Sequence, residues 1–418
     1  MSFPVERFAA ALLFLYPVLL LTVRSGANAC FLLLIILAFY ELLRSPREFF
    51  VGVSDKTFLL YSAAMASLAV ATLISQTYHM KFTLNPYDAA SRFVLAVPVY
   101  LLLQRFPTRY LTVLQYGFIC AALATILIAA LFHYSSANRL GTYFMDVIHF
   151  GDLALILGLI ACLTVNWDRA DPWPVIALKI AAFLTGLNAS IQSGSRGGWL
   201  AIPVVFAVWA LLVGKRVFWL TKSLAALTLS VTMAALYTFA TPVHERINAL
   251  ISDLLVFDRF KDTSTGIRIQ IWVAALHLLA QHPVFGVGPD DFEKSVPALT
   301  AMGYLTPMGA ELARAEVHNE ILSRAVTLGT FGIASILLIY FVPLTLFLRL
   351  TGSPDRITRR AGMLGSCFVV SFFIFGLTVE IFNLKTTATF YSLTVAVLLA
   401  IATNRRVIGR SKTAPPVG

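Results

Sequence analysis

Apolar residues dominate the chain in long runs that are separated by short polar connections. We count about twelve runs long enough to cross about 30 Å of hydrocarbon as helices. They lie near residues 8–23, 26–43, 57–75, 90–104, 111–133, 147–165, 174–190, 198–213, 219–241, 321–349, 361–382 and 386–403. The pattern predicts an all-α integral membrane protein with nine helices in residues 1–241, a loop at 242–318, three helices in 319–403 and a tail at 404–418.

Composition agrees with this pattern. The chain is 58% hydrophobic and only 13% charged, whereas an average soluble domain is about 25% charged. The four cysteines all lie inside apolar runs and lack C-x-x-C spacing, so neither a disulfide framework nor a thiolate metal site is indicated. No small-residue cleavage site follows the run at 8–23, so we interpret it as a retained helix and not as a signal peptide.

The net charge of +11 is spread through the short loops, which argues against a nucleic-acid partner. If both termini are cytoplasmic, most cations fall in inside loops, as the positive-inside rule requires. The predicted outside cations are fewer: Arg24, Lys81, Arg92, Arg139, Arg196, Lys385 and those of residues 242–318. A cation on the outside therefore calls for a specific reason.

Arg196 lies at the predicted outer boundary, in the stretch "SGSRGGWLA" between two apolar runs. Three glycines around it would let another backbone or a ligand come close. The alternative is that Arg196 reaches lipid headgroups while Trp199 anchors the interface.

The outer loop at 242–318 is too long to be an ordinary connection, so it is either functional or disordered. Helical spacing of apolar residues predicts an amphipathic helix near 265–281, with Thr265 as its N-cap. The predicted apolar face is Ile269, Trp272, Val273, Leu276, Leu279 and Ala280. Arg268 would lie in the first turn, where it and the free N–H groups favour an anion. The alternative is pairing of Arg268 with Asp262 or a phospholipid headgroup.

The loop ends in "RAEVHNEILSRAV", which places His318 and Asn319 at the same outer boundary. His318 has three interpretations: an interfacial polar residue, a metal ligand, or a general base. Metal binding has the least support, because paired histidine spacing is missing. Upstream, Arg139 lies in a polar turn that precedes the run at 147–165.

Arginine binds phosphate oxygens two at a time and stays charged, so several arginines at one place suit a diphosphate. They could stabilise a diphosphate leaving group without a metal, since the nearest carboxylate pair, Asp290 and Asp291, is adjacent in sequence and would diverge. His318 would then take the proton from an attacking hydroxyl.

The motifs "SGSRGGWLA", "GIRIQIWVAAL" followed by "GVG", and "HNEIL", in this order among about twelve runs, resemble the bacterial O-antigen ligase and polymerase superfamily. The resemblance implies a C-type (GT-C) membrane glycosyltransferase that moves a glycan from undecaprenyl diphosphate to the lipid A-core of lipopolysaccharide, with inversion and without metal or cofactor. It implies a Gram-negative inner-membrane protein whose site faces the periplasm.

Carried over by motif, the resemblance implies diphosphate-binding arginines at Arg196 and Arg268, with Arg139 less securely matched, and a base at His318 next to Asn319. The chain reads "DVIHFGD" where the superfamily often has asparagine, which leaves the roles of His149 and Asp152 open. Polymerases and pilin or other protein glycan ligases share the donor, so they are alternatives. An anion or lipid transporter and a non-catalytic lipid-binding scaffold are alternatives of other classes, although carriers place ionisable residues near the midplane.

Overall fold

A computed structural model describes residues 5–50, 55–131, 139–213 and 262–404. Its long helices are α1 (Val5–Thr22), α2 (Gly26–Arg44), α4 (Lys56–Tyr78), α5 (Tyr87–Leu103), α7 (Leu114–Leu131), α8 (Val147–Leu163), α9 (Trp173–Ser193), α11 (Ala201–Val213), α14 (Ser264–Gln281), α15 (Phe292–Ala301), α16 (Pro307–Ala315), α17 (Glu320–Leu350), α18 (Arg356–Gly376) and α19 (Lys385–Ala402). Short helices α3 (Pro46–Phe49), α6 (Thr108–Leu111) and α10 (Arg196–Trp199) join them. The described residues form no strand, which agrees with the predicted all-α fold.

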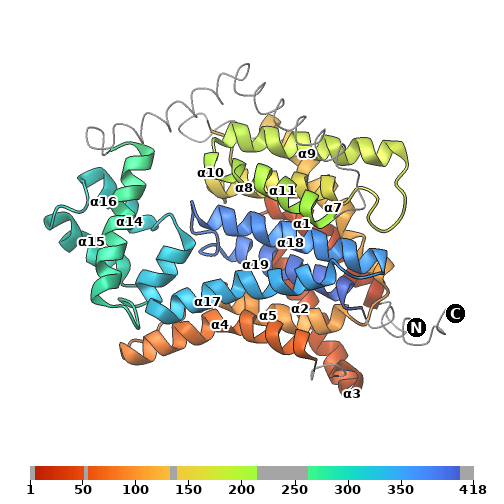
Figure 1. Ribbon diagram of the computed structural model, residues 1–418, viewed down its shortest axis with the longest axis horizontal. Coiled ribbons are helices and arrows are strands. Elements are labelled where there is room, and N and C mark those ends of the chain that lie inside the picture. Colours follow the sequence, from red (N-terminus) through yellow and green to blue (C-terminus); the bar gives the residue numbers. More distant parts are fainter. Residues whose placement is uncertain (1–4, 51–54, 132–138, 214–261, 405–418) are drawn as a thin grey trace.

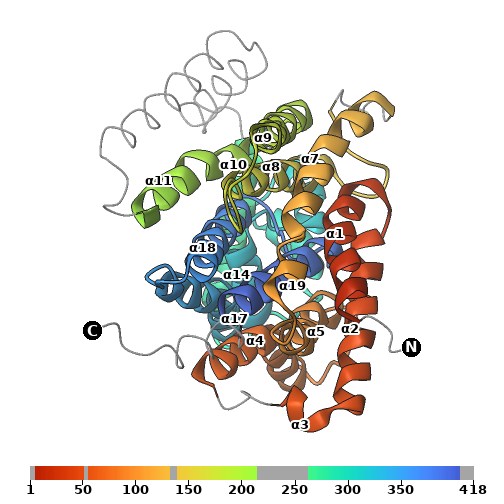
Figure 2. The same cartoon turned by 90° about the vertical axis from the view of Figure 1, so that its right-hand side faces the viewer.

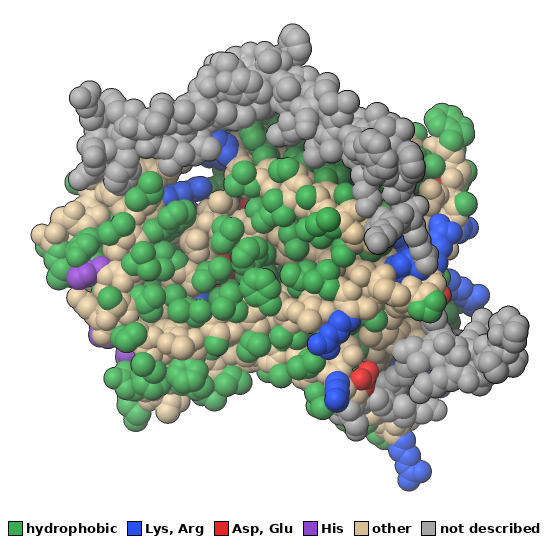
Figure 3. All heavy atoms as spheres, in the orientation of Figure 1, with side chains coloured by type: hydrophobic (Ala, Val, Ile, Leu, Met, Phe, Trp, Pro, Cys, Tyr) green, Lys and Arg blue, Asp and Glu red, His purple; other side chains and the backbone are tan. Residues whose placement is uncertain are grey.

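Nine helical stretches in these ranges are long and apolar enough to cross a membrane. Two further predicted runs coincide with α5 and α8, which have 17 residues each. The run at 219–241 lies outside the described residues, so a count of twelve stays a prediction. Hydrophobic side chains cover the middle of the surface, and most of the visible Lys and Arg side chains gather toward its right-hand end (Figure 3).

The helices surround α19, which lies inside the bundle (Figure 2). Every residue of α19 from Thr387 to Ala402 is buried, and the helix contacts α2, α5, α17 and α18. A helix that is apolar all round is expected at such a central position. Its few hydroxyls are satisfied internally, as where Thr394 meets the Tyr16 hydroxyl at 2.8 Å.

Contacts between helix ends sort the loops onto two faces of the bundle. On one face, Arg105 pairs with Glu41 at 3.4 Å, and Asn404 donates to the carbonyl of Phe106 at 2.8 Å. On the other face, Lys385 pairs with Asp88 at 2.6 Å. Helices α14, α15 and α16 gather beyond this second end (Figure 1).

Residues 262–319 form a compact helical unit, the α14–α16 unit, with its own small core. That core comprises Ile267, Ile271, Ala274, Ala275, Leu278, Phe292, Val296, Leu299, Leu305, Ala310, Ala313 and Val317, and Val326 of α17 packs into it. The predicted apolar face of α14 is wrong: Val273 and Leu276 are exposed, and the buried face is the one that carries Ile267, Ile271 and Ala274. The apolar residues run nearly all round this helix, so spacing alone selected the wrong stripe.

A kink in α17 attaches the α14–α16 unit to the bundle. Gly329 has φ 64° inside this helix. The carbonyls of Val326 and Thr327 accept hydrogen bonds from the N–H groups of Val287 and Gly288, at 2.9 and 3.1 Å. The segment "GVG" therefore inserts its backbone into the break, where it pairs carbonyls that a continuous helix would have satisfied.

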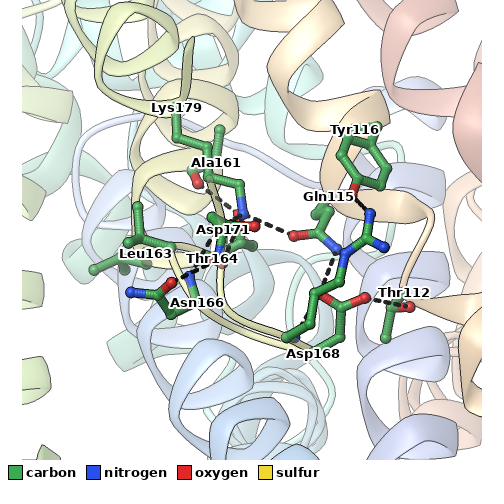
Figure 4. Close-up of polar contacts among 12 residues, drawn as sticks. Thr112, Gln115, Tyr116, Ala161, Leu163, Thr164, Asn166, Asp168, Asp171 and Lys179 are labelled. Carbon is green, nitrogen blue, oxygen red and sulfur yellow. Dashed lines mark hydrogen bonds and ion pairs between the residues drawn. The ribbon is translucent and has the colours of Figure 1, made fainter. Parts of the chain in front are cut away.

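A polar network around Lys179 links residues of α7, α8 and α9 (Figure 4). The Lys179 ammonium donates to Asp171 Oδ2 at 2.7 Å, Gln115 Oε1 at 2.8 Å and the Thr164 carbonyl at 2.9 Å. Asp171 is in turn bonded to the backbone of Asn166. Lys179 is fully buried, and each of its three donors has an acceptor, so this charge serves to join α7, α8 and α9.

Candidate functional site

A cavity of about 300 Å³ lies between the membrane helices and the α14–α16 unit. Its lining includes Arg139, Arg196 and Arg268, which come from three segments far apart in the sequence. Arg139 precedes α8, Arg196 opens α10, and Arg268 lies in the first turn of α14. The three arginines predicted to share a site therefore line one space.

The "SGSRGG" turn is shaped by close contacts with its neighbours. Helix α9 ends at Ser193, and Gly194 follows with φ 70°. The Ser193 carbonyl accepts a hydrogen bond from Arg139 Nε at 2.6 Å. A Cβ on Gly197 would lie 2.2 Å from Thr378 Oγ1, and one on Gly198 would lie 2.3 Å from Asp152 Oδ1. The glycines here do permit close approach, although the neighbours at Gly197 and Gly198 are side chains and not another backbone.

Asp152 ties this turn to α8. Its side chain is fully buried, and Oδ1 accepts a hydrogen bond from the Ser195 hydroxyl at 2.6 Å. Its second oxygen, Oδ2, has no hydrogen-bond partner among the described residues. Asp152, whose role the sequence left open, thus holds the turn next to Arg196 in place.

The N-terminus of α14 faces the cavity through Ser264 and Thr265. The predicted N-cap at Thr265 is wrong, because Thr263 caps the helix and its hydroxyl accepts from the N–H of Gly266 at 3.1 Å. Both threonines suit a cap, and the chain enters the helix two residues earlier than expected. The first turn of an α-helix favours anions, so this end adds to the positive potential of the arginines.

Arg268 is partly buried beside the cavity. Burial lowers its pKa, and the charges of Glu316 and Asp152 oppose that shift. A guanidinium nevertheless stays charged at any physiological pH. A partly buried cation beside a cavity is the arrangement that gains most from an anionic ligand.

His318 does not line this cavity, but Glu316 links it to the arginines. The Nδ1 atom of His318 contacts the Glu316 carboxylate, and both side chains are largely buried. Burial would raise the pKa of Glu316, but the contact with His318 and the charge of His149 hold it below its usual value. His318 itself has φ 58°, a conformation that costs about 1–3 kcal/mol and tends to occur at functional sites.

Two other predicted polar residues have structural contacts. Asn319 is the N-cap of α17: its oxygen accepts from the N–H of Leu322 at 3.0 Å, and its amide donates to the Leu377 carbonyl at 3.2 Å. The Nδ1 atom of His149 contacts Asp146, the N-cap of α8, and its Nε2 atom lies 3.3 Å from the carbonyl of Glu380. These contacts hold the loop at 377–384 against the site.

Fold and site together define a multi-pass membrane protein with a cationic cavity beside an extramembrane helical unit. Residues 180–337 match the family described as O-antigen ligase. The matched stretch includes Arg196, Arg268 and His318, whereas Arg139 lies before it. The family is a glycosyltransferase-like superfamily of ligases and polymerases.

The chain is also similar to an uncharacterized protein of Haemophilus influenzae. The two are 25% identical over 296 residues, which cover 68% of this chain and 71% of the relative. This distant relative carries no functional assignment, so the family match alone supports an activity of the O-antigen ligase or polymerase type, which implies lipid-linked glycan substrates.

Proposed function

We propose that the protein is an O-antigen ligase that transfers a glycan from undecaprenyl diphosphate to the lipid A-core of lipopolysaccharide. The observation that carries this proposal is the cavity lined by Arg139, Arg196 and Arg268 at the first turn of α14. Three guanidinium groups match the two phosphates of such a donor, and Arg196 and Arg268 lie in the stretch that matches the O-antigen ligase family. The site faces the periplasm, and both termini are cytoplasmic.

In this proposal the arginines stabilise the departing diphosphate. The acceptor hydroxyl attacks the anomeric carbon of the glycan, the bond from that carbon to the phosphate oxygen breaks, and its electron pair stays on the diphosphate. Fixed cations stabilise the charge that grows on that oxygen. This single displacement inverts the anomeric configuration and uses no metal.

His318 is the general base that takes the proton of the acceptor hydroxyl. Its Nδ1 atom lies against the Glu316 carboxylate, so in the neutral imidazole Nε2 is left to take the proton. Glu316 is a positioning residue: it orients the imidazole ring and stabilises the imidazolium that forms, as carboxylates do in other catalytic pairs.

The test is glycan transfer in liposomes from an undecaprenyl-diphosphate-linked glycan to rough lipopolysaccharide, with excess EDTA. We expect the wild-type protein to transfer the glycan, and His318→Ala to lose about 10²–10⁴-fold in kcat while donor binding is retained. Longer lipid-linked chains without modified lipopolysaccharide would identify a polymerase instead. No product with either acceptor would overturn the enzymatic proposal.

A further inference from the structure

A second, larger cavity opens on the same face and lies outside the arginine site. Its volume is about 530 Å³, within the range of roughly 300–1,000 Å³ typical of small-molecule sites. Four segments form it: the loop after α4, the segment that leads into α15, the α16–α17 junction and the loop between α18 and α19. Its polar lining includes Thr83, Asn85, Glu316, Arg324, Glu380 and Asn383.

The chemistry of this lining differs from that of the arginine cavity. Lys81 and Lys294 both pair with Asp291, each at 2.5 Å, and Arg324 Nε donates to Glu320 at 2.7 Å. The cations are therefore matched by carboxylates, so the cavity offers little net attraction for a phosphate. Amides, hydroxyls and paired charges together suit a neutral ligand that is rich in hydroxyl groups.

Two groups at the cavity retain hydrogen-bonding capacity. Arg324 Nη2 is buried and has no hydrogen-bond partner in the part of the chain that the structure describes. Burial and the neighbouring charge of Glu320 raise the pKa of Glu380 to about 7, so this carboxyl can donate as well as accept near neutral pH. A sugar hydroxyl, which donates one hydrogen bond and accepts two, complements such a pair.

Glu316 connects the two cavities. It lines the larger one, contacts His318, and acts electrostatically on Arg268, which lines the smaller one. In a single displacement, the attacking oxygen approaches the anomeric carbon on the side opposite the leaving group. An acceptor sugar is therefore expected to bind near Glu316 and His318, on the side of the glycan that faces away from the arginines.

We propose that the larger cavity is a carbohydrate subsite that holds the acceptor sugar, with Asn85 and Asn383 as specificity-determining contacts. This inference rests on the proposed transfer reaction and adds to it the place of the second substrate. Both asparagines are exposed at the cavity rim, so replacing them removes ligand contacts without opening the core.

The test compares steady-state transfer by wild type, Asn85→Ala and Asn383→Ala in liposomes, with donor and acceptor varied separately. We expect each variant to raise the KM for acceptor about tenfold, the size of one lost hydrogen-bonding group, with kcat and donor KM within about twofold of wild type. The matched control is Gln281→Ala, an exposed amide that bonds to His277 outside both cavities, which should leave all three parameters unchanged. An unchanged acceptor KM in both variants, or a rise in donor KM alone, would overturn the assignment.

A binding measurement separates this inference from the proposed activity. The probe is the soluble oligosaccharide released from rough lipopolysaccharide, added to the full-length protein in detergent and followed by hydrogen exchange. We expect slower exchange at residues 289–294 and 380–383, and weaker protection in Asn383→Ala. If wild type transfers glycan but the probe protects neither segment, the subsite is wrong and the ligase proposal stands. If the wild-type protein transfers no glycan, the proposed function is wrong, and the subsite proposal, which rests on it, is wrong as well.

Discussion

Two regions of the molecule gather buried or half-buried charges, and they do so in opposite ways. Around Lys179, each donor of the ammonium group has a protein acceptor within 2.9 Å. At the other end of the bundle, three arginines line an open space of about 300 Å³. The Oδ2 atom of the nearby Asp152 has no hydrogen-bond partner among the described residues. The first arrangement is complete within the protein, whereas the second has room for an anion.

This comparison separates structural from functional charges more clearly than the sequence does. Both regions lie at helix ends, and both contain a cation next to a carboxylate. Lys179 and Arg196 are each flanked by apolar residues, so local composition does not distinguish a structural cation from a ligand-binding one. Only the geometry distinguishes a lysine that joins three helices from arginines that surround a cavity.

Among the variants that compare these two regions, those that remove an arginine should have the largest effect. Arg268→Ala or Arg196→Ala should lower kcat/KM for transfer roughly 30- to 5,000-fold, because losing one partner of a charged contact costs about 2–5 kcal/mol. Arg314→Ala, an exposed arginine of α16 outside both cavities, is the matched control and should transfer normally. Equal activity of Arg268→Ala and Arg314→Ala would mean that the arginine cavity does not contribute to transfer, which contradicts its assignment as the functional region.

Breaking the Lys179 network should instead reduce stability. Lys179→Met leaves Asp171 buried without its cation, which should cost about 3–5 kcal/mol of unfolding free energy, and adding Asp171→Leu should recover part of the loss. Lys385→Met, which breaks an exposed pair with Asp88, should cost under about 1 kcal/mol. Unfolding of each variant in detergent measures the difference. A Lys179→Met protein of normal stability but without transfer would mean that Lys179 belongs to the active machinery.

The buried carboxyl of Glu380 should make stability depend on pH. Its folded-state pKa of about 7 lies above the usual value for glutamate, so the folded protein holds the proton more tightly than the unfolded chain. The contribution is complete below about pH 4.5 and is lost as pH rises through about 7, a change of about 3 kcal/mol. Glu380→Gln should abolish this loss, so the variant should be more stable than wild type at pH 8. Glu311→Gln, on the exposed surface of α16, should follow the wild-type curve throughout.

The smallest effect concerns the backbone that attaches the α14–α16 unit to the bundle. Gly286→Ala should cost about 2–3 kcal/mol, because its φ of 69° disfavours a side chain and a Cβ would lie 2.3 Å from the carbonyl carbon of Thr327. Gly303→Ala is the control for φ alone, since its φ is 82° and a Cβ there meets no atom within 4 Å. Equal melting temperatures for the two variants would mean that the inserted "GVG" segment does not stabilise the unit.

The sequence predicted the helical membrane fold because runs of apolar residues report membrane spans directly. It also selected Arg139, Arg196 and Arg268, since each is a cation at a predicted outer boundary and lies in a turn or at a helix end. It could not predict that Thr263, and not Thr265, caps α14, or which face of that helix is buried. Those features depend on how the chain enters the helix and on what covers it.

Other parts of the site had signals that the sequence alone could not interpret. The glycines of "GVG" and Gly329 are separated by about forty residues, and only the fold places one segment inside the kink of the other. Glu316 lies two residues before His318 in the sequence, but only the structure shows that its carboxylate contacts the imidazole. Asp152 and Ser195 pair across two helices, a contact without local pattern.

The most direct test of the central claim is the affinity of the purified protein for undecaprenyl diphosphate, measured for wild type, Arg268→Ala and His318→Ala. The account predicts that Arg268→Ala loses affinity while His318→Ala binds as tightly as wild type, since the arginines hold the diphosphate and the histidine acts only in the displacement. Undiminished binding by Arg268→Ala, or loss of binding by His318→Ala alone, would contradict it.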